Sequence, residues 1–158
     1  MQRAGQPGHA NRADLLVAVV RFADARRGLA EAVAEIEHAP TGVAALRALA
    51  AMQARLNPSI WPLARLLEAM RHQDKAAERS WRDRLENRRQ GCRAIVARLR
   101  QEGALRPDLR PEVAVDFLST LTSLQTWEDL VLVSGWTAKQ YQVRVTYLLM
   151  RALVARAA

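Results

Sequence analysis

Hydrophobic residues recur every three or four positions along most of the chain, which is the period of a helix buried on one face. The first such stretch covers residues 14–36, and its apolar line is Leu15, Val19, Phe22, Leu29, Val33 and Ile36. A break at Pro40-Thr41-Gly42 precedes a second helix, which is expected to end at Asn57-Pro58-Ser59. That triplet also predicts the cap of a third helix over residues 60–70.

A fourth, long helix is predicted between Asp74, a good N-cap residue, and Gly103, a good C-terminal cap. Its apolar stripe consists of Ala77, Trp81, Leu85, Cys92, Ile95 and Leu99. Pro107 and Pro111 then exclude a continuous helix, and Pro111 suits the first turn of a fifth one. The prolines therefore predict a tight corner between two antiparallel helices.

The fifth helix is expected to bury Val113, Phe117 and Leu121, and a short helix is expected over residues 127–133. Thr137 with Gln140 three residues later forms a capping box that opens the last helix. These patterns predict an all-α bundle of about six or seven helices in one domain, residues 10–158. Residues 1–9 lack a helical period and are expected to be a disordered remnant.

The last helix is apolar on two opposite faces, Tyr141/Val145/Leu148/Ala152 and Val143/Tyr147/Met150/Val154. A helix of this kind is buried on both sides, either deep in one bundle or between two chains. A two-fold homodimer is the favoured interpretation, although the pattern leaves open which face forms the interface. The expected interface residues are Phe117, Leu121, Val143, Tyr147, Met150 and Val154.

Composition agrees with a helical protein, because half of the 158 residues are hydrophobic and only 5% are aromatic. No stretch is apolar enough to cross a bilayer, and the single cysteine, Cys92, excludes an internal disulfide, which fits the cytoplasm. The net charge of +8 comes from 24 basic and 16 acidic residues. The arginines are interleaved with acids, which favours a solvated surface over a nucleic-acid footprint.

Motifs for enzymatic chemistry are missing from the sequence. The three histidines lie far apart, and there is no nucleophile motif, glycine-rich phosphate loop or CxxC pair. Glu35-x-x-His38 is half of a di-iron bundle motif, which needs a second copy and further glutamates. We therefore expect neither catalysis nor a metal or cofactor, and a di-metal bundle enzyme remains the least favoured alternative.

Arg88 interrupts the apolar stripe of the fourth helix, so its guanidinium must reach solvent, pair with an acid or meet a ligand. Pairing with Asp116 or Glu128 is the plainer interpretation. The alternative is a pocket for an amphipathic small molecule, because Gln53 interrupts the second helix in the same way and several tryptophans accompany it. The candidate ligand-binding residues are Gln53, Trp61, Trp81, Arg88, Phe117 and Trp127.

The C-terminal half contains a series of short motifs, which occur in order as Trp81, Gly103-Ala104-Leu105-Arg106-Pro107, Leu121-Thr122-Ser123, Trp127, Leu130-Val131, Gly135-Trp136 and Tyr141. In this combination they resemble the C-terminal half of TetR-family transcriptional regulators. Upstream, "ANRADLLVAVV" at residues 10–20 is similar to the junction that leaves the family's DNA-binding domain. The resemblance therefore covers nearly the whole chain.

The resemblance implies an effector-binding and dimerisation domain, in which helices corresponding to residues 111–124 and 137–156 form a four-helix dimer interface. It implies a pocket among the helices of residues 42–102, through which a small-molecule effector controls a transcriptional repressor. Residues 1–9 are too short for the family's helix-turn-helix domain, so DNA binding is expected only through a domain absent from this chain. The alternative is a dimeric small-molecule binder that acts through protein partners.

Overall fold

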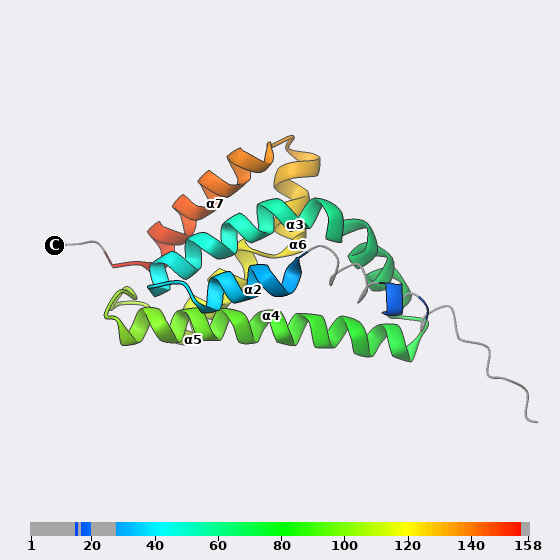
Figure 1. Cartoon of the computed structure of the whole chain (residues 1–158), viewed down its shortest axis with the longest axis horizontal. Helices are drawn as coiled ribbons and strands as arrows, with labels where there is room; N and C mark the ends of the chain where they lie inside the picture. The colour runs from blue at the N-terminus through cyan, green and yellow to red at the C-terminus, as the bar shows by residue number, and fades with distance from the viewer. Residues whose placement is uncertain (1–14, 16, 20–27, 156–158) are drawn as a thin grey trace, which may run out of the picture.

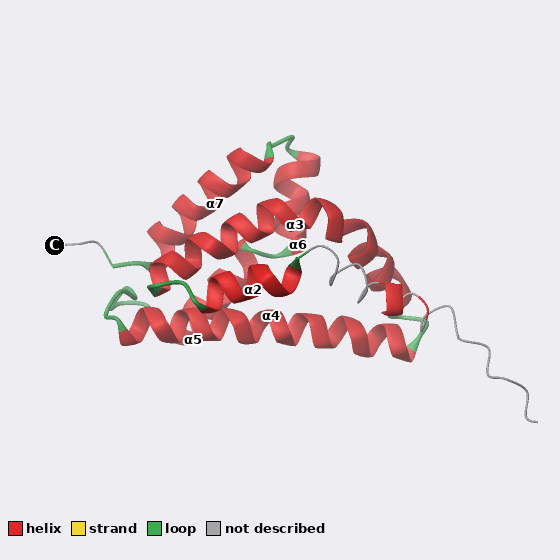
Figure 2. Ribbon diagram, viewed as in Figure 1, coloured by secondary structure: helices red, strands yellow, loops and turns green. Residues whose placement is uncertain are grey.

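The computed structural model describes residues 15, 17–19 and 28–155 and forms an all-α bundle, as the sequence predicted (Figure 1). Short loops join the helices, and the described residues contain no strand (Figure 2). The elements in chain order are α2 (Leu29–Glu37), α3 (Gly42–Met70), α4 (Lys75–Gln101), α5 (Pro111–Leu121), α6 (Leu124–Trp127), the π-helix η1 (Glu128–Val133) and α7 (Ala138–Leu153). None of the described helices combines the length and apolarity needed to cross a membrane.

Helix α3 is one continuous element of 29 residues, so the expected break at Asn57-Pro58-Ser59 is wrong. Pro58 and Pro62 lie inside it and each removes one backbone donor, which bends a helix without ending it. Figure 1 shows the result as an arch, with α3 rising from its N-terminus and then turning down towards the start of α4. We call α3 the arch, because it contacts α4 near both of its ends, at Gly42 and at Leu67.

The first end of the arch approaches α4 closely. A Cβ atom added to Gly42 would lie 2.9 Å from the backbone nitrogen of Leu99. The backbone N–H of Gly42 also donates to both carboxylate oxygens of Glu102, at 2.8 and 3.0 Å. Thr41 caps this helix through its side chain, which accepts from the backbone of Ala44. Glycine is therefore required here by close helix contact.

Both ends of α4 are capped as expected from the sequence. The Asp74 side chain accepts hydrogen bonds from the backbone N–H groups of Ala76 and Ala77. At the other end, Gly103 has a φ of 66° and Ala104 N–H donates to the Leu99 carbonyl at 2.8 Å, the pattern of a Schellman motif. Pro111 begins α5, so the corner between the two helices lies where the prolines placed it.

The corner after α4 is also tied to the end of the chain. The Arg106 N–H donates to the Leu153 carbonyl at 2.9 Å, and the Ala155 N–H donates to the Ala104 carbonyl at 2.9 Å. Leu105 and Val154 thereby form an isolated antiparallel bridge. Four helix ends, from α3, α4, α5 and α7, consequently gather at one end of the bundle (Figure 1).

The expected single helix over residues 14–36 is wrong, because Gly28 is the N-cap of α2 with a left-handed φ of 72°. A residue in that conformation cannot lie inside an α-helix. Of the expected apolar line, Leu15 and Val19 are exposed and Leu29 is half-buried. The expectations for Phe22 and for residues 1–9 lie outside the described residues.

The buried face of α5 differs from the expected one, and the buried face of α7 agrees with the expected one at Tyr141 and Val145 only. On α5 the core residues are Ala114, Val115 and Leu118, whereas Phe117 is 45% exposed, so the expected burial of Phe117 is wrong. On α7 the core residues are Tyr141, Val145, Leu149 and Leu153. Leu148, which was assigned to the face of Tyr141, is 43% exposed.

Candidate functional site

The interior is divided into two hydrophobic clusters along α4. The main core contains the last third of α4 together with α5, α6, α7 and the first half of α3. The small core joins Leu67 of α3 to Ala77 of α4, with Leu63, Met70, Ala76 and Trp81 packed against it. Between Ala77 and Cys92, α4 has no buried residue. The middle of α4, beneath the arch, is therefore the place where apolar packing is interrupted.

Seven buried side-chain atoms among the described residues have no hydrogen-bond partner: Asn57 Nδ2, Trp61 Nε1, Arg71 Nε, Arg88 Nε, Trp127 Nε1, Glu128 Oε2 and the Tyr141 hydroxyl. Glu128 Oε2 is an acceptor, and the other six can donate. We call Asn57, Trp61, Arg88, Trp127 and Tyr141 the donor cluster. Most buried polar groups in native proteins have a hydrogen-bond partner, in the protein or in ordered water.

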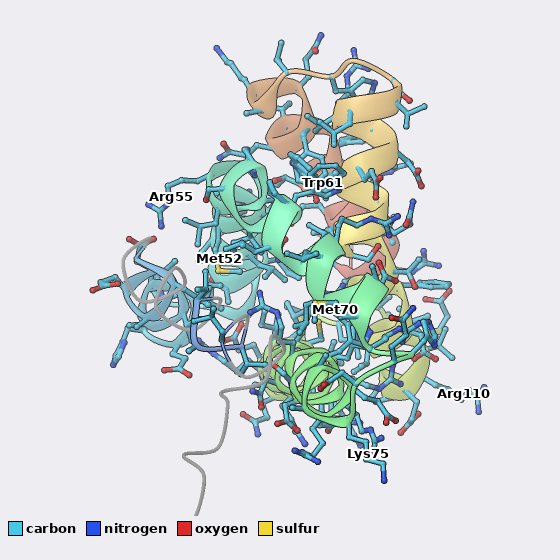
Figure 3. The ribbon with its side chains drawn as sticks, turned by 90° about the vertical axis from the view of Figure 1, so that its right-hand side faces the viewer. Met52, Arg55, Trp61, Met70, Lys75 and Arg110 are labelled. Atoms are coloured by element: carbon cyan, nitrogen blue, oxygen red, sulfur yellow. The ribbon has the colours of Figure 1, made fainter. Side chains whose placement is uncertain are left out.

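The α3 residues of the donor cluster lie on the face of α3 that is turned towards α6 and η1. Asn57, Trp61 and Arg65 are spaced by four residues and so share one face of α3. Arg65 Nε lies 3.8 Å from Glu128 Oε2, which brings this face to the start of η1, next to Trp127. Figure 3 shows Trp61 on the side of α3 that faces α6 and η1, whereas Met52 and Arg55 leave α3 on the side of α2. Trp127 and Tyr141 both belong to the main core, against which Trp61 packs.

Arg88 reaches from the middle of α4 to the C-terminal end of α5. Its guanidinium donates to the carbonyl of Ser119 and, at 3.3 Å, to the hydroxyl of Thr122. A cation at a helix C-terminus is favourable, since the last carbonyls carry partial negative charge. Burial lowers the pKa of Arg88.

The expected alternative in which Arg88 pairs with Asp116 or Glu128 is wrong. Asp116 binds the neighbouring Arg89 at 2.7 Å, and Glu128 is the carboxylate near Arg65. Within residues 28–155 no carboxylate contacts Arg88. The positive charge is therefore balanced by dipoles only.

Tyr141 is fully buried at the first turn of α7, and burial raises the pKa of its phenol to about 12. The charge of Arg88 acts in the opposite direction and lowers the pKa. Tyr141 thus links α7 to the interruption in α4. Its hydroxyl accepts no hydrogen bond and donates none.

The structure brings together part of the sequence-predicted pocket. Gln53 is buried on α3, Trp61 is partly buried, and Trp127 is 2% exposed in the main core. Trp81 instead packs in the small core, where the guanidinium of Arg71 lies 5.5 Å from its ring centre. Phe117 lies on the exposed side of α5 and does not face the donor cluster.

Two members of the donor cluster, Asn57 and Tyr141, were not predicted as binding residues. Asn57 precedes a proline, which predicts the end of a helix, yet it is buried inside α3. Tyr141 was recognised only as an apolar position of the last helix. A polar group at the core face of a helix was the available signal for both.

Metal chemistry has no support among the described residues, where no three His, Cys, Asp or Glu side chains form a group that could hold an ion. His38 Nδ1 lies 2.8 Å from the carbonyl of Ala34, and Glu35 pairs with Arg55 at 3.6 Å. The half-motif Glu35-x-x-His38 is therefore engaged in local contacts.

An open groove between α4 and α5 is lined by Arg89, Arg93 and Arg100 together with Pro111 and Val115. Arg89 is paired with Asp116, and Arg93 is paired with Glu86 at 2.8 Å. The groove is thus a solvated surface whose cations are largely compensated. It contains none of the unpartnered buried donors.

A second candidate site is an apolar surface on α5 and α7. Phe117, Val143 and Tyr147 are 45%, 59% and 61% exposed, and Leu148 is exposed beside them in sequence. Leu121, Met150 and Val154 are half-buried. We call Phe117, Val143 and Tyr147 the α5–α7 surface. The structure therefore settles which face of α7 belongs to the core, and the other face remains accessible.

Comparison with family models, with curated proteins and with solved structures found no match for this chain. The fold class and the site geometry are therefore the basis for assigning a function.

Proposed function

We propose that the chain is the effector-binding and dimerisation domain of a TetR-like transcriptional regulator. The observation that carries the proposal is the donor cluster, in which Arg88 Nε, Trp127 Nε1 and the Tyr141 hydroxyl are buried without hydrogen-bond partners. A site of this kind combines apolar walls with a few polar groups, as small-molecule sites do. The TetR-like motif order in the sequence supports the choice among helical regulators.

In the proposed mechanism, an effector binds under α3 and changes the relative position of α3 and α4. A dimer couples this shift to the spacing of two DNA-reading domains, which makes the binding of effector and DNA mutually dependent. DNA contact, repression and a cytoplasmic location are parts of this proposal. The chain contributes the sensor and the dimer contacts.

Effector binding is tested with the 158-residue chain and a panel of amphipathic small molecules carrying anionic, neutral or cationic head groups. At least one compound is expected to raise the melting temperature and to change tryptophan fluorescence, since a ligand that binds only the folded state stabilises it. A panel in which no compound of any charge has either effect would contradict the sensor function.

The dimer is proposed to form through the α5–α7 surface. Exposed apolar side chains of this number on neighbouring helices are costly in water, and a two-fold axis buries them on both chains at once. A stable interface buries about 1,600 Å² in total. The partner is thus a second copy of the chain.

Sedimentation velocity tests the dimer with Val143→Glu combined with Tyr147→Glu. Leu85→Glu is the matched control, because Leu85 is 46% exposed on α4, outside the α5–α7 surface. The wild-type chain and the control should sediment as dimers at micromolar concentration, and the double variant as a folded monomer. A folded wild-type monomer under these conditions would refute the proposed interface.

A further inference from the structure

We infer that the groove between α4 and α5 binds an acidic amphipathic helix of a partner protein. The lining of the groove comes from one stripe of α4, between Arg89 and Gln101, and from the first turns of α5. No residue of the lining belongs to the donor cluster or to the α5–α7 surface. Binding in the groove is therefore separate from the proposed effector site and from the proposed dimer.

The groove has the length of a short helix. Its lining on α4 recurs at spacings of three or four residues from Arg89 to Gln101, which is one face of a helix over about 18 Å. The groove has a volume of about 690 Å³. Half of a cylinder 10 Å wide and 18 Å long, the size of a three-turn helix, has a volume of roughly 700 Å³. The open groove thus suits a helix laid along it, whereas a small-molecule site encloses most of its ligand.

The floor of the groove is apolar. Val96 and Val115 are buried beneath it, and Ala97 and Pro111 lie at its surface. Ala97 is exposed and small, so a second helix can approach α4 closely at this position. An amphipathic helix that binds in a groove places its apolar face on such a floor. Nucleic acid would need only the cations, because its phosphates carry the contact.

The charges of the groove select an acidic partner. Residues 87–101 of α4 contain five arginines and no acid. Three of them, Arg89, Arg93 and Arg100, line the groove, where Glu112 is the only acid of the lining. Within the part of the chain that the structure describes, Arg100 forms no ion pair.

The other two arginines of the groove can exchange their partners. The ion pairs of Arg89 and Arg93 join side chains that are between 42% and 57% exposed. Pairs between exposed side chains contribute little to stability, so carboxylates of a bound helix can replace the present ones. Acids along one edge of the partner helix would therefore follow the α4 wall, with its apolar face on the floor.

Binding is measured by fluorescence anisotropy with the full chain and a labelled synthetic peptide of three Glu-Leu-Ala-Glu-Glu-Leu-Ala repeats. A comparison peptide carries glutamine in place of every glutamate and keeps the same apolar face. The acidic peptide is expected to bind at least about fivefold more tightly, because each new surface ion pair contributes about two- to fivefold in affinity.

Two pairs of variants locate the binding in the groove. Ala97→Trp fills the groove and should weaken the acidic peptide about tenfold or more, whereas Ala94→Trp, at an exposed α4 position outside the lining, should not. Arg100→Gln should weaken it about two- to fivefold. Arg79→Gln removes the same charge from an exposed α4 position outside the groove. It should bind like the wild type at about 0.15 M salt, where charges more than about 8 Å away are largely screened.

Circular dichroism first establishes that each variant keeps the helix content of the wild type. Failure of the wild-type chain to bind the acidic peptide, or equal affinity for the two peptides, overturns the inference. Equal weakening by Ala94→Trp and Ala97→Trp also overturns it, because binding would then lie outside the groove. None of these outcomes changes the result of the effector panel or of sedimentation, which test the sensor and the dimer.

Discussion

Replacement of Gly42 by alanine is expected to destabilise the protein, even though alanine is the better helix former. The added Cβ would lie 2.9 Å from Leu99 N, 3.0 Å from Leu99 Cδ2 and 3.1 Å from Leu99 Cγ. The closest of these atoms is backbone, so the helices must separate rather than a side chain rotate. That separation also pulls the Gly42 N–H away from the carboxylate of Glu102.

The magnitude follows from three contributions to the free energy of unfolding. Overpacking costs about 1–3 kcal/mol, and the loss of hydrogen bonds to a charged group costs about 1.5–3 kcal/mol. The gain from replacing glycine in a helix offsets about 0.5–1 kcal/mol. The net loss is about 1.5–5.5 kcal/mol, which lowers the melting temperature of a domain of this size by roughly 3–22 °C.

Gly91→Ala is the matched control, because Gly91 lies inside α4 and a Cβ there meets nothing within 4 Å. This variant should stabilise the protein by about 0.5–1 kcal/mol through helix propensity alone. Thermal and urea unfolding are followed by circular dichroism at one protein concentration, since association shifts apparent stability. If Gly42→Ala unfolds at the same temperature as Gly91→Ala, the close contact between α3 and α4 is wrong.

Two other predictions can be tested with the same unfolding measurements. Burial raises the pKa of Tyr141 to about 12 from its usual value near 10, so the folded state holds the phenol proton more tightly than the unfolded state. The contribution of Tyr141 to the free energy of unfolding should therefore be full below pH 10 and fall as the pH rises through 12. The Tyr141→Phe variant should lack this pH dependence. Urea unfolding at pH 9 and pH 11 measures the fall, and an equal fall in the variant would rule out Tyr141 as its source. Thr137→Ala should cost about 1 kcal/mol, because Thr137 and Gln140 form the capping box of α7; an unchanged melting temperature would show that this cap does not stabilise the helix.

Local signals in the sequence located most helix ends, because capping depends on a few neighbouring residues. Asp74, Gly103, Pro111 and Thr137 occupy the expected cap positions. The break expected at Asn57-Pro58 is absent, since packing at both ends of α3 stabilises a helix that has lost two backbone donors. Tertiary contacts decide such cases, and a single sequence does not contain them.

The candidate site was only partly predictable for a related reason. Arg88 stood out because a charge in an apolar stripe is visible in the sequence, and it proved to be half-buried without an acidic partner. Phe117 was misplaced because α5 is short, and a change of one residue in the assigned face turns a core position into a surface one. Trp81 and Trp127 pack in different hydrophobic clusters, and the hydrophobic periodicity of the sequence does not predict this separation.

The hydrogen bonds that tie Ala104 and Arg106 to the end of α7 have a mechanical consequence. They fix the C-terminal end of α4 to the rest of the bundle, so we expect a rotation of α4 to have that end as its pivot. With 27 residues, α4 is about 40 Å long. A rotation of about 5° at the pivot therefore moves its N-terminal end by about 3.5 Å, while Arg88, near the middle, moves about half as far. A small displacement of α4 at Arg88 therefore becomes a larger one at the N-terminal end of α4, where the chain leaves α3.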